Sequence, residues 1–460
     1  MTLIKSISGI RGTIGGKPGE GMNPLDLVKF TSAFSQWVKL QSKGEKKLKV
    51  VVGRDARISG DMLNRVVTAT FSAMGINVVD IGLATTPTCE IAVQEIEADG
   101  GIILTASHNP KQWNALKLLN NEGEFLSDLN GKKVLELAEI QDFDYAKIDD
   151  IGEIICDYSF TKKHIDKILA LELVDREAIK NANFKIAIDC VNSVGGIAIP
   201  QLLDALGVQQ VEKLYCEPNG IFPHNPEPLP ENLTELSNLV VEKKVNLGFV
   251  VDPDVDRLAI VNEDGTMFGE EYTLVAVADY VLSKSKSNTV SNLSSTRALQ
   301  DVTEKHGKQY FASAVGEVNV VNAMKKHNAT IGGEGNGGVI FPELHYGRDA
   351  LVGIALFLSQ LAKSGKKCSE LRKTYPNYFI SKNKMVIDEN IDADAIFTNL
   401  KEKYSANKII DIDGIRIDFD QEWVQIRKSN TEPIIRIYAE STSEENADSL
   451  AQKIIEDIQI

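Results

Sequence analysis

The chain has 460 residues, of which 43% are hydrophobic and 25% are charged. This length is too great for one hydrophobic core and predicts roughly three or four domains, and the composition is that of a soluble globular protein. The net charge of -15 at pH 7 argues against nucleic acid or an anionic membrane as a general partner. An acidic chain that binds phosphate has to do so with locally concentrated arginine and lysine.

The sequence also indicates the cellular compartment in which we expect the protein. We find no apolar run long enough to cross a bilayer, and the first residues lack the pattern of a secretory signal. The five cysteines are dispersed, without a Cys-x-x-Cys pair that would indicate zinc or redox chemistry. We therefore expect a cytoplasmic protein with reduced thiols, and both a monomer and a homodimer stay open.

Repeated strand–helix units run through the first part of the chain. The predicted elements, in order, are a helix over 24–41, a strand over 48–53, a helix over 61–74 and strands over 77–81 and 101–104. Apolar strands separated by helices indicate strands that are buried on both faces. This part therefore predicts a mostly parallel α/β sheet.

The strand–helix pattern begins again twice, and a different pattern follows towards the C-terminus. The predicted elements are strands over 184–189, 247–251 and 259–262 and helices over 270–283 and 318–327. Beyond Pro376, residues 409–419 and 423–439 alternate as in an antiparallel sheet, and residues 443–460 predict a helix that covers it. The fold class is α/β, with three similar mixed α/β domains and a smaller C-terminal α+β domain. We place the domains at 1–152, 153–257, 258–375 and 376–460.

The stretch Thr105–Pro110 places a serine, Ser107, directly after a buried strand. Ligands bind at the carboxyl ends of strands in open α/β sheets. The Ser, Asn and Pro that follow favour a turn or a helix start, whose backbone N–H groups would suit an anion on the serine hydroxyl. The alternative is that Ser107 only caps a helix.

A second stretch, Asp252–Arg257, follows the predicted strand over 247–251. In an extended segment, carboxylates at 252, 254 and 256 point the same way. Their mutual repulsion is relieved most simply by a hard divalent cation, and Mg²⁺ fits because it needs few protein oxygens. The alternative is a solvated acidic loop, which is common in acidic proteins.

Two further loops complete the candidate site. The Gly-rich loop over 332–338 holds Glu334 and Asn336, which could bond vicinal sugar hydroxyls or simply form a tight turn. The loop over 427–433 combines Arg427 with hydroxyl and amide donors, and Arg436 follows in the next strand. Such a cluster favours a phosphate cradle over a plain surface turn.

These four stretches, in this order, resemble the motifs of the α-D-phosphohexomutase superfamily over the whole chain. That family includes phosphoglucomutases, phosphomannomutases, phosphoglucosamine mutases and acetylglucosamine-phosphate mutases. The resemblance implies four domains around a central cleft, each contributing one of the loops. It also implies hexose phosphates as small-molecule partners.

The resemblance assigns a role to each site residue. The implied metal ligands, for one Mg²⁺ per chain, are Ser107, Asp252, Asp254 and Asp256. The implied catalytic residues are the phosphoserine Ser107, the proposed general base Lys117, the N-terminal Arg11 and the neighbouring His108. The implied substrate-binding residues are Arg257, Glu334, Asn336, Arg427, Ser429, Asn430, Thr431 and Arg436. Asn336 and Asn430 depart from the family's usual Ser and Gly, which puts any sugar assignment from the loops in doubt.

The implied reaction is reversible phosphoryl transfer between the 1- and 6-positions of a hexose phosphate. It passes through phosphoserine at Ser107 and a hexose 1,6-bisphosphate, which also serves as activator. We favour a phosphoglucosamine mutase over a phosphoglucomutase or phosphomannomutase. A metal-dependent sugar phosphatase and a catalytically silent sugar-phosphate-binding protein are the other hypotheses. If Lys117 acts as a base, burial or neighbouring cations should lower its pKa.

Overall fold

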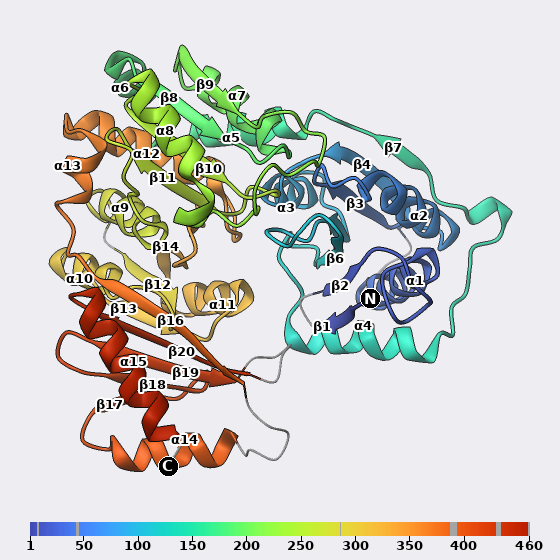
Figure 1. Cartoon of the computed structure of the whole chain (residues 1–460). Helices are drawn as coiled ribbons and strands as arrows, with labels where there is room; N and C mark the ends of the chain where they lie inside the picture. Colours follow the sequence, from blue (N-terminus) through green and yellow to red (C-terminus); the bar gives the residue numbers. More distant parts are fainter. Residues whose placement is uncertain (7–8, 43–45, 286, 387–392, 429–433, 459–460) are drawn as a thin grey trace. The chain divides into compact units, whose positions relative to one another are not determined.

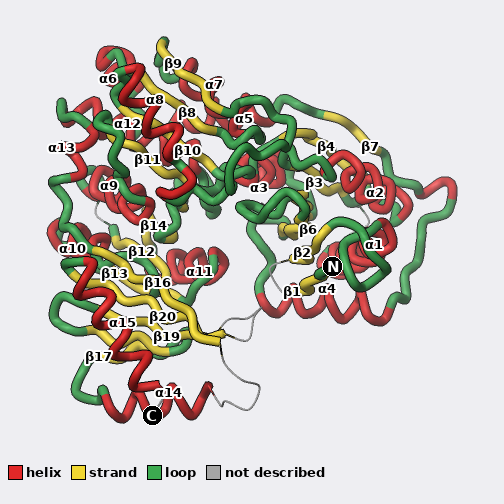
Figure 2. The backbone as a smooth tube through the Cα atoms, in the orientation of Figure 1, coloured by secondary structure: helices red, strands yellow, loops and turns green. Residues whose placement is uncertain are grey.

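The computed structural model describes residues 1–6, 9–42, 46–285, 287–386, 393–428 and 434–458 (Figure 1). The chain divides into two compact units, one formed by residues 1–273 and 337–371 and the other by residues 274–336 and 372–460. Figure 2 shows that each unit combines helices with strands. Among the residues that the structure describes, no helix has the length and apolar character needed to cross a membrane.

The first unit begins with a seven-stranded sheet. Its strands, in spatial order, are β1 (Leu3–Ser6), β2 (Gly9–Thr13), β6 (Trp113–Leu119), β5 (Gly100–Leu104), β3 (Lys49–Arg54), β4 (Asn77–Leu83) and β7 (Ile154–Cys156). The β3, β4, β5 and β7 strands run parallel to their neighbours in this group, whereas the pairs β1–β2, β2–β6 and β5–β6 are antiparallel. The sheet is therefore mixed, and the mostly parallel arrangement predicted for this part is wrong.

Helices cover both faces of this sheet, namely α1 (Pro24–Gln41), α2 (Gly60–Ala73), α3 (Thr86–Glu95) and α4 (Asp128–Ile140). In β3, Val50 and Val52 join the core cluster that includes residues of α1, α2 and α4, whereas Val51 joins the cluster that includes residues of α3. Successive strand residues point to opposite faces. The uninterrupted apolar run in β3 follows from this, because both faces are buried.

A second sheet of the first unit carries the acidic stretch. Its order is β11 (Leu258–Asn262), β10 (Leu247–Val251), β8 (Lys185–Asp189) and β9 (Gln210–Leu214). The accompanying helices are α5 (Phe160–Ala170), α6 (Arg176–Ala182), α7 (Gly195–Ala205), α8 (Thr234–Lys243) and α12 (Ala350–Ser364). Because β11 pairs with β10 in an antiparallel hairpin, this sheet runs across the predicted domain boundary at residue 257.

The second unit contains one parallel and one antiparallel strand group. In the first group, β12 (Asn288–Asn292) lies between β13 (Tyr310–Ser313) and β14 (Ala329–Glu334), and the helices are α10 (Ala298–Lys305) and α11 (Glu317–His327). The C-terminal sheet is antiparallel, in the order β16 (Phe379–Val386), β20 (Ile434–Ser441), β19 (Trp423–Lys428), β18 (Ile415–Asp418) and β17 (Lys408–Ile410).

The remaining α-helices are α9 (Glu270–Leu282), α13 (Cys368–Arg372), α14 (Ala393–Lys403) and α15 (Glu444–Ile458). Of these, α9 and α15 match the predictions at 270–283 and 443–460, whereas α13 and α14 were not predicted. Leu450 and Ile454 of α15 share a buried cluster with Ile437 of β20, so α15 covers the C-terminal sheet. The predicted antiparallel sheet and its covering helix are confirmed.

A buried carboxyl group joins the strand groups of the second unit. Glu440 of β20 is fully buried, and its Oε1 accepts hydrogen bonds from Trp423 Nε1 at 2.6 Å and from the Arg297 backbone N–H at 2.9 Å. Burial raises the pKa of Glu440 to about 7, although these donors oppose the rise. Ionisation of Glu440 therefore costs stability, because the folded pKa lies above the ordinary value of 4.5.

We predict that Glu440→Gln stabilises the protein increasingly as the pH rises. Below both pKa values the carboxyl is protonated in the folded and unfolded chain, so Glu440 has no pH-dependent effect there. Between pH 4.5 and 8 the parent loses up to about 3 kcal/mol that the glutamine variant keeps. Thermal unfolding of both proteins across this range measures the difference.

The control is Glu444→Gln at the exposed start of α15, whose stability difference from the parent should not change in the same window. A pH-independent difference for Glu440→Gln would contradict the prediction.

Candidate active site

Ser107 lies in a tight double turn between β5 and β6. The Asn109 N–H donates to the Ala106 carbonyl, and the Trp113 N–H donates to the Pro110 carbonyl, both at 3.0 Å. These turns reverse the chain, so that β6 returns antiparallel to β5. Of the turn and the helix start that were predicted after Ser107, the structure has the turn, so helix-terminal N–H groups do not surround this serine.

The backbone of Ser107 has a φ of 49°, in the left-handed region that a serine rarely occupies. Its side chain is buried, and its hydroxyl donates a hydrogen bond to Asp252 Oδ2 at 2.7 Å. The strained turn thus aims the hydroxyl at the acidic loop that comes 145 residues later. Strain of this kind is concentrated at functional sites.

A buried arginine that the sequence analysis did not select holds this turn. The side chain of Arg57 is fully buried, and its Nε donates to Asp55 Oδ2 at 3.0 Å. Its Nη atoms donate to the carbonyl oxygens of Ser107, Asn109, Pro110 and Trp113. The only sequence signal is that residues 54–60, like the serine stretch, follow a strand end.

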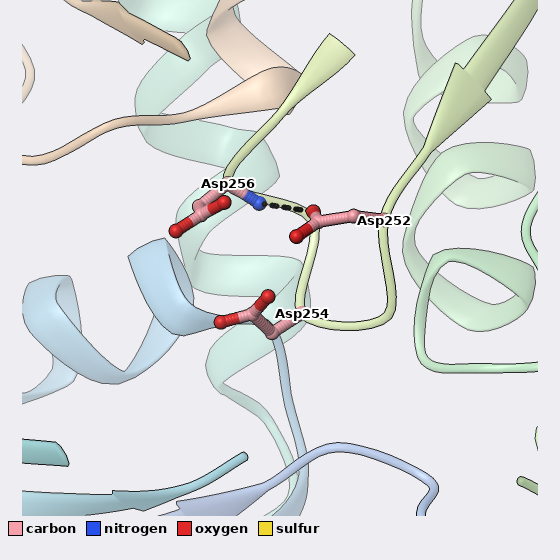
Figure 3. Close-up of side chains that lie close together, drawn as sticks. All are labelled: Asp252, Asp254 and Asp256. Carbon is pink, nitrogen blue, oxygen red and sulfur yellow. Dashed lines mark hydrogen bonds between the residues drawn. The ribbon is translucent and has the colours of Figure 1, made fainter. Parts of the chain in front are cut away.

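The three aspartates lie in the hairpin turn between β10 and β11 (Figure 3). Val255 has a φ of 63°, so a turn gathers the carboxylates and the predicted extended segment is wrong. All three residues are buried, and one oxygen from each lies within 4.8 Å of the others. The Asp256 backbone N–H donates to Asp252 Oδ1 at 3.2 Å.

The donor set of this turn fits a hard divalent cation. Within the described part of the chain, Oδ1 of Asp254 and Oδ1 of Asp256 are buried without a hydrogen-bond partner. Buried carboxylate oxygens in that state are costly unless a cation or a donor reaches them. Carboxylate oxygens are also the ligands that Mg²⁺ prefers.

Lys117 of β6 compensates part of this charge. Its Nζ lies 2.7 Å from Asp254 Oδ2 and 3.7 Å from Asp256 Oδ2. Burial alone would lower the pKa of Lys117, but Asp254 and Asp256 outweigh burial and raise it. The expected lowering of its pKa is therefore wrong for this state, in which Lys117 is an ammonium and a proton donor.

Burial and neighbouring charges shift the pKa values of Asp252 and Asp254 in opposite directions. Burial, followed by Asp256 and Asp254, raises the pKa of Asp252 well above its ordinary range. For Asp254, burial acts in the same direction, but Lys117 outweighs it and the pKa is lowered. Burial and neighbouring charge therefore oppose ionisation at Asp252, next to Ser107, whereas the Lys117 ammonium favours ionisation at Asp254.

Three further predicted residues lie around Ser107 in the first unit. Arg11 Nη1 donates to Asn109 Oδ1 at 3.0 Å, and His108 Nδ1 lies 3.4 Å from Ser107 Oγ. Burial, then Arg257 and Arg11, lowers the pKa of His108 to about 2, so this imidazole is neutral. The Arg257 backbone N–H donates to Asp252 Oδ1 at 3.2 Å.

Two residues absent from the predicted site support the acidic turn. Arg348 Nη2 donates to Asp256 Oδ2 at 2.7 Å, and Thr86 Oγ1 donates to Asp254 Oδ2 at 2.6 Å. Thr86 begins α3, and Arg348 precedes α12. Neither position carries a local sequence signal, because only tertiary contact reveals their partner.

The other predicted residues belong to the second unit. Glu334 ends β14 and accepts hydrogen bonds from Asn292 Nδ2 at 2.7 Å and from the Gly316 N–H at 3.2 Å. Asn336 follows in the turn after β14. Arg427 and Arg436 are cross-strand partners on β19 and β20. Ser429, Asn430 and Thr431 lie outside the described residues.

Comparison with known proteins assigns the chain to a family. Four models of phosphoglucomutase/phosphomannomutase domains match it, namely α/β/α domain I at residues 3–144, domain II at 162–265, domain III at 269–378 and the C-terminal domain at 385–457. The chain is a phosphohexomutase, an isomerase of the phosphoglucomutase/phosphomannomutase family, with that family's four-domain α/β architecture.

Individual relatives carry more than one name. A phosphoglucomutase/phosphomannomutase of Thermococcus kodakarensis is 37% identical over 442 residues, covering 95% of both chains. A phosphoglucosamine/phosphogalactosamine mutase of Sulfurisphaera tokodaii is 32% identical and covers 99% of this chain and 98% of its own. A crystal structure of a family member from Burkholderia thailandensis has a TM-score of 0.84 at 24% identity, covering 98% and 96% of the two chains. The names do not resolve the sugar.

We predict that Arg57→Met destabilises the protein by about 3–5 kcal/mol, because it leaves the buried Asp55 carboxylate without its cation. Denaturant unfolding measures the loss. The double variant Arg57→Met/Asp55→Asn should lose less than the sum of the single losses, since an amide leaves no uncompensated charge.

Arg65→Met, at an exposed ion pair on α2, is the control and should stay within about 0.5 kcal/mol of the parent. Equal losses for Arg57→Met and Arg65→Met would contradict the role of Arg57.

Proposed function

We propose that the chain interconverts the 1- and 6-phosphates of glucosamine through a phosphoserine at Ser107 and a hexose 1,6-bisphosphate. The observation that carries this proposal is the hydrogen bond of 2.7 Å from Ser107 Oγ to Asp252 Oδ2. It joins a buried hydroxyl to one of three clustered carboxylates, and Lys117, Arg11 and His108 lie close by. Membership of the mutase family supports the reaction class.

The transfer requires proton movements that these residues suit. In the first half, the bond between phosphorus and Ser107 Oγ breaks as the substrate hydroxyl attacks; that hydroxyl loses a proton, and the released Ser107 oxygen takes one up. In the second half, Ser107 loses its proton as it attacks the bisphosphate, and the sugar oxygen that leaves phosphorus takes one up. Lys117 is the ammonium that can supply the proton to the leaving oxygen and, once neutral, can accept the proton that the attacking hydroxyl loses, so that it is an ammonium again after each half. Positioning of the two oxygens in line supplies much of the rate.

Asp252, Asp254 and Asp256 would hold the metal ion, with a Ser107 phosphate oxygen as a further ligand. An N-acetylphosphoglucosamine mutase of Aspergillus fumigatus has been solved in complex with GlcNAc-6P and magnesium, and we extend Mg²⁺ to this chain on the fit of its donor set. A bound Mg²⁺ neutralises charge on the transferring phosphoryl group. Arg11 and Arg257 add positive field from the protein itself.

The other predicted residues would bind the rest of the substrate. Glu334 and Asn336 would bond sugar hydroxyls, and the distal phosphate would be held by Arg427, Ser429, Asn430, Thr431 and Arg436. The phosphoserine, metal, sugar and phosphate roles would fall to four successive domains, predicted at 1–152, 153–257, 258–375 and 376–460, with β11 added to the metal domain because it pairs with β10. Hexose 1,6-bisphosphate would act as activator by rephosphorylating Ser107.

Two alternatives for the sugar have support among the relatives. Relatives named as phosphoglucosamine mutases, such as that of Methanopyrus kandleri at 30% identity over 456 residues, favour glucosamine phosphate. The 37% identity to a phosphoglucomutase/phosphomannomutase favours the alternative, glucose or mannose phosphate. Both alternatives use the same phosphoserine chemistry.

Initial rates with the 1-phosphates of glucosamine, N-acetylglucosamine, glucose and mannose test the proposal. With Mg²⁺ and bisphosphate present, we predict the highest kcat/KM for glucosamine 1-phosphate and no mutase turnover by Ser107→Ala. Intact-mass and peptide analysis of the parent should locate phosphate on Ser107. The control is Ser405→Ala, at an exposed serine after α14, which should turn over like the parent.

A faster reaction with glucose or mannose 1-phosphate would transfer the assignment to the alternative. Full turnover by Ser107→Ala would overturn the phosphoserine mechanism.

We predict that removal of metal abolishes turnover and that Asp254→Asn weakens binding of a divalent cation. Titration of the apoprotein with Mn²⁺, followed by electron paramagnetic resonance, measures binding independently of activity. The loss should exceed the ten- to hundredfold that is typical when a group behind a metal ligand is removed. Asp264→Asn, in the exposed turn after β11, is the matched control and should bind like the parent. Unchanged turnover in EDTA would exclude the aspartate turn as a catalytic metal site.

A further inference from the structure

The segment after β9 lies against the loops that carry the serine turn. Gly220 approaches the Ala56 carbonyl so closely that a Cβ would meet its oxygen at 2.1 Å, and its φ of 72° also favours glycine. The Phe222 ring lies 5.0 Å from the guanidinium carbon of Arg57. The Asn192 side chain donates to the Ile221 carbonyl at 3.0 Å. The segment is therefore fixed next to the residues that support Ser107.

The same segment places the carboxylate of Glu227 at the site. Its backbone carbonyl accepts hydrogen bonds from the Leu229 N–H and from Asn232 Nδ2, each at 2.8 Å. Its backbone N–H donates to Asn225 Oδ1 at 3.3 Å. Because these contacts involve the backbone, the position of the residue is set independently of where its carboxylate binds.

The Glu227 carboxylate faces two groups of the predicted site. Its Oε1 lies 3.6 Å from Arg257 Nη1 and 4.0 Å from His108 Nε2. The other ring nitrogen of His108, Nδ1, lies 3.4 Å from Ser107 Oγ. Hydroxyl, imidazole and carboxylate thus form a row, in which the carboxylate is the outer member.

A carboxylate beside a phosphate site needs a physical reason, because it repels the phosphate that the site binds. Glu227 can compensate for this repulsion through its effects on His108 and Arg257. A carboxylate only accepts hydrogen bonds, so it favours the neutral His108 tautomer that carries its proton on Nε2. That tautomer presents the Nδ1 lone pair to Ser107. The same carboxylate restrains the guanidinium of Arg257, whose backbone is already held by Asp252.

We propose that Glu227 is a positioning residue for phosphoryl transfer at Ser107, where it restrains Arg257 and selects the His108 tautomer whose Nδ1 lone pair faces the serine oxygen. This inference rests on the proposed function of Ser107 and deepens it. Glu227 acts through His108 and Arg257 and does not itself contact the reacting oxygen.

Kinetics separate this role from a general structural one. Glu227→Gln keeps the size of the side chain but removes its charge, and we expect kcat to fall about tenfold to hundredfold, as is typical when a reacting group is misplaced. KM for the sugar phosphate should not rise, because an anion has been removed from a phosphate site. The matched control is Glu231→Gln, which changes an exposed glutamate four residues further on and should behave like the parent. An unchanged kcat, or a raised KM with kcat retained, would overturn the proposal.

A spectroscopic measurement tests the tautomer without any turnover. The chain has six histidines, so ¹⁵N-histidine labelling gives a small set of ring signals, and His108→Gln assigns those of His108. In the parent we expect the ring nitrogen shifts of the Nε2–H tautomer, and in Glu227→Gln a shift of that tautomeric balance. An Nδ1–H tautomer in the parent overturns the proposal even if the variant does not fold. Full activity of Ser107→Ala would instead refute the proposed function and leave the tautomer result standing.

Discussion

Three carboxylates buried in one turn are the constraint on which the first unit depends. Buried charge is tolerated only when it is paired and hydrogen-bonded. The pairing groups come from separate elements, since Lys117 lies on β6, Thr86 begins α3 and Arg348 precedes α12. Each of these elements must be in place before the acidic turn is compensated. The contacts of the turn therefore link the two sheets of the first unit.

The serine turn also depends on a buried charged group, which in this case pairs with main-chain carbonyls. A serine at a φ of 49° stores strain of about 1–3 kcal/mol, which persists only where the surroundings impose it. Arg57 imposes it by donating to four carbonyl oxygens of the turn. Because Arg57 is itself neutralised by Asp55, a fully buried ion pair fixes the backbone that aims Ser107 at Asp252.

The sequence predicted those features that local chemistry determines. Strands such as β3 and β10 were predictable because burial on both faces requires an uninterrupted apolar run. The positions of Ser107 and of the three aspartates just after β5 and β10 were predictable, because strand ends are where functional groups are expected in α/β sheets.

Open alternatives and errors arise where the sequence is compatible with two local structures. Ser, Asn and Pro after β5 serve equally well in a helix start and in a tight double turn. Lys117 was expected to have a lowered pKa, but its partner Asp254 is 137 residues away and outweighs burial. Arg57, Arg348 and Glu227 were not predicted for the same reason, because each contacts site residues that are distant in sequence.

The cations of the site differ in whether their partners can be exchanged. The guanidinium of Arg57 donates hydrogen bonds to backbone carbonyls and to Asp55. It therefore contributes positive charge to the site without exchanging its partners. Lys117 and Arg257 are paired instead with side-chain carboxylates, those of Asp254 and Glu227. A carboxylate can yield its cation to a phosphate, because both are oxygen acceptors and the phosphate carries more charge. A protein with a net charge of -15 can therefore bind the phosphate group of a sugar by exchanging the partners of a few cations. It does not need a broad basic surface for this.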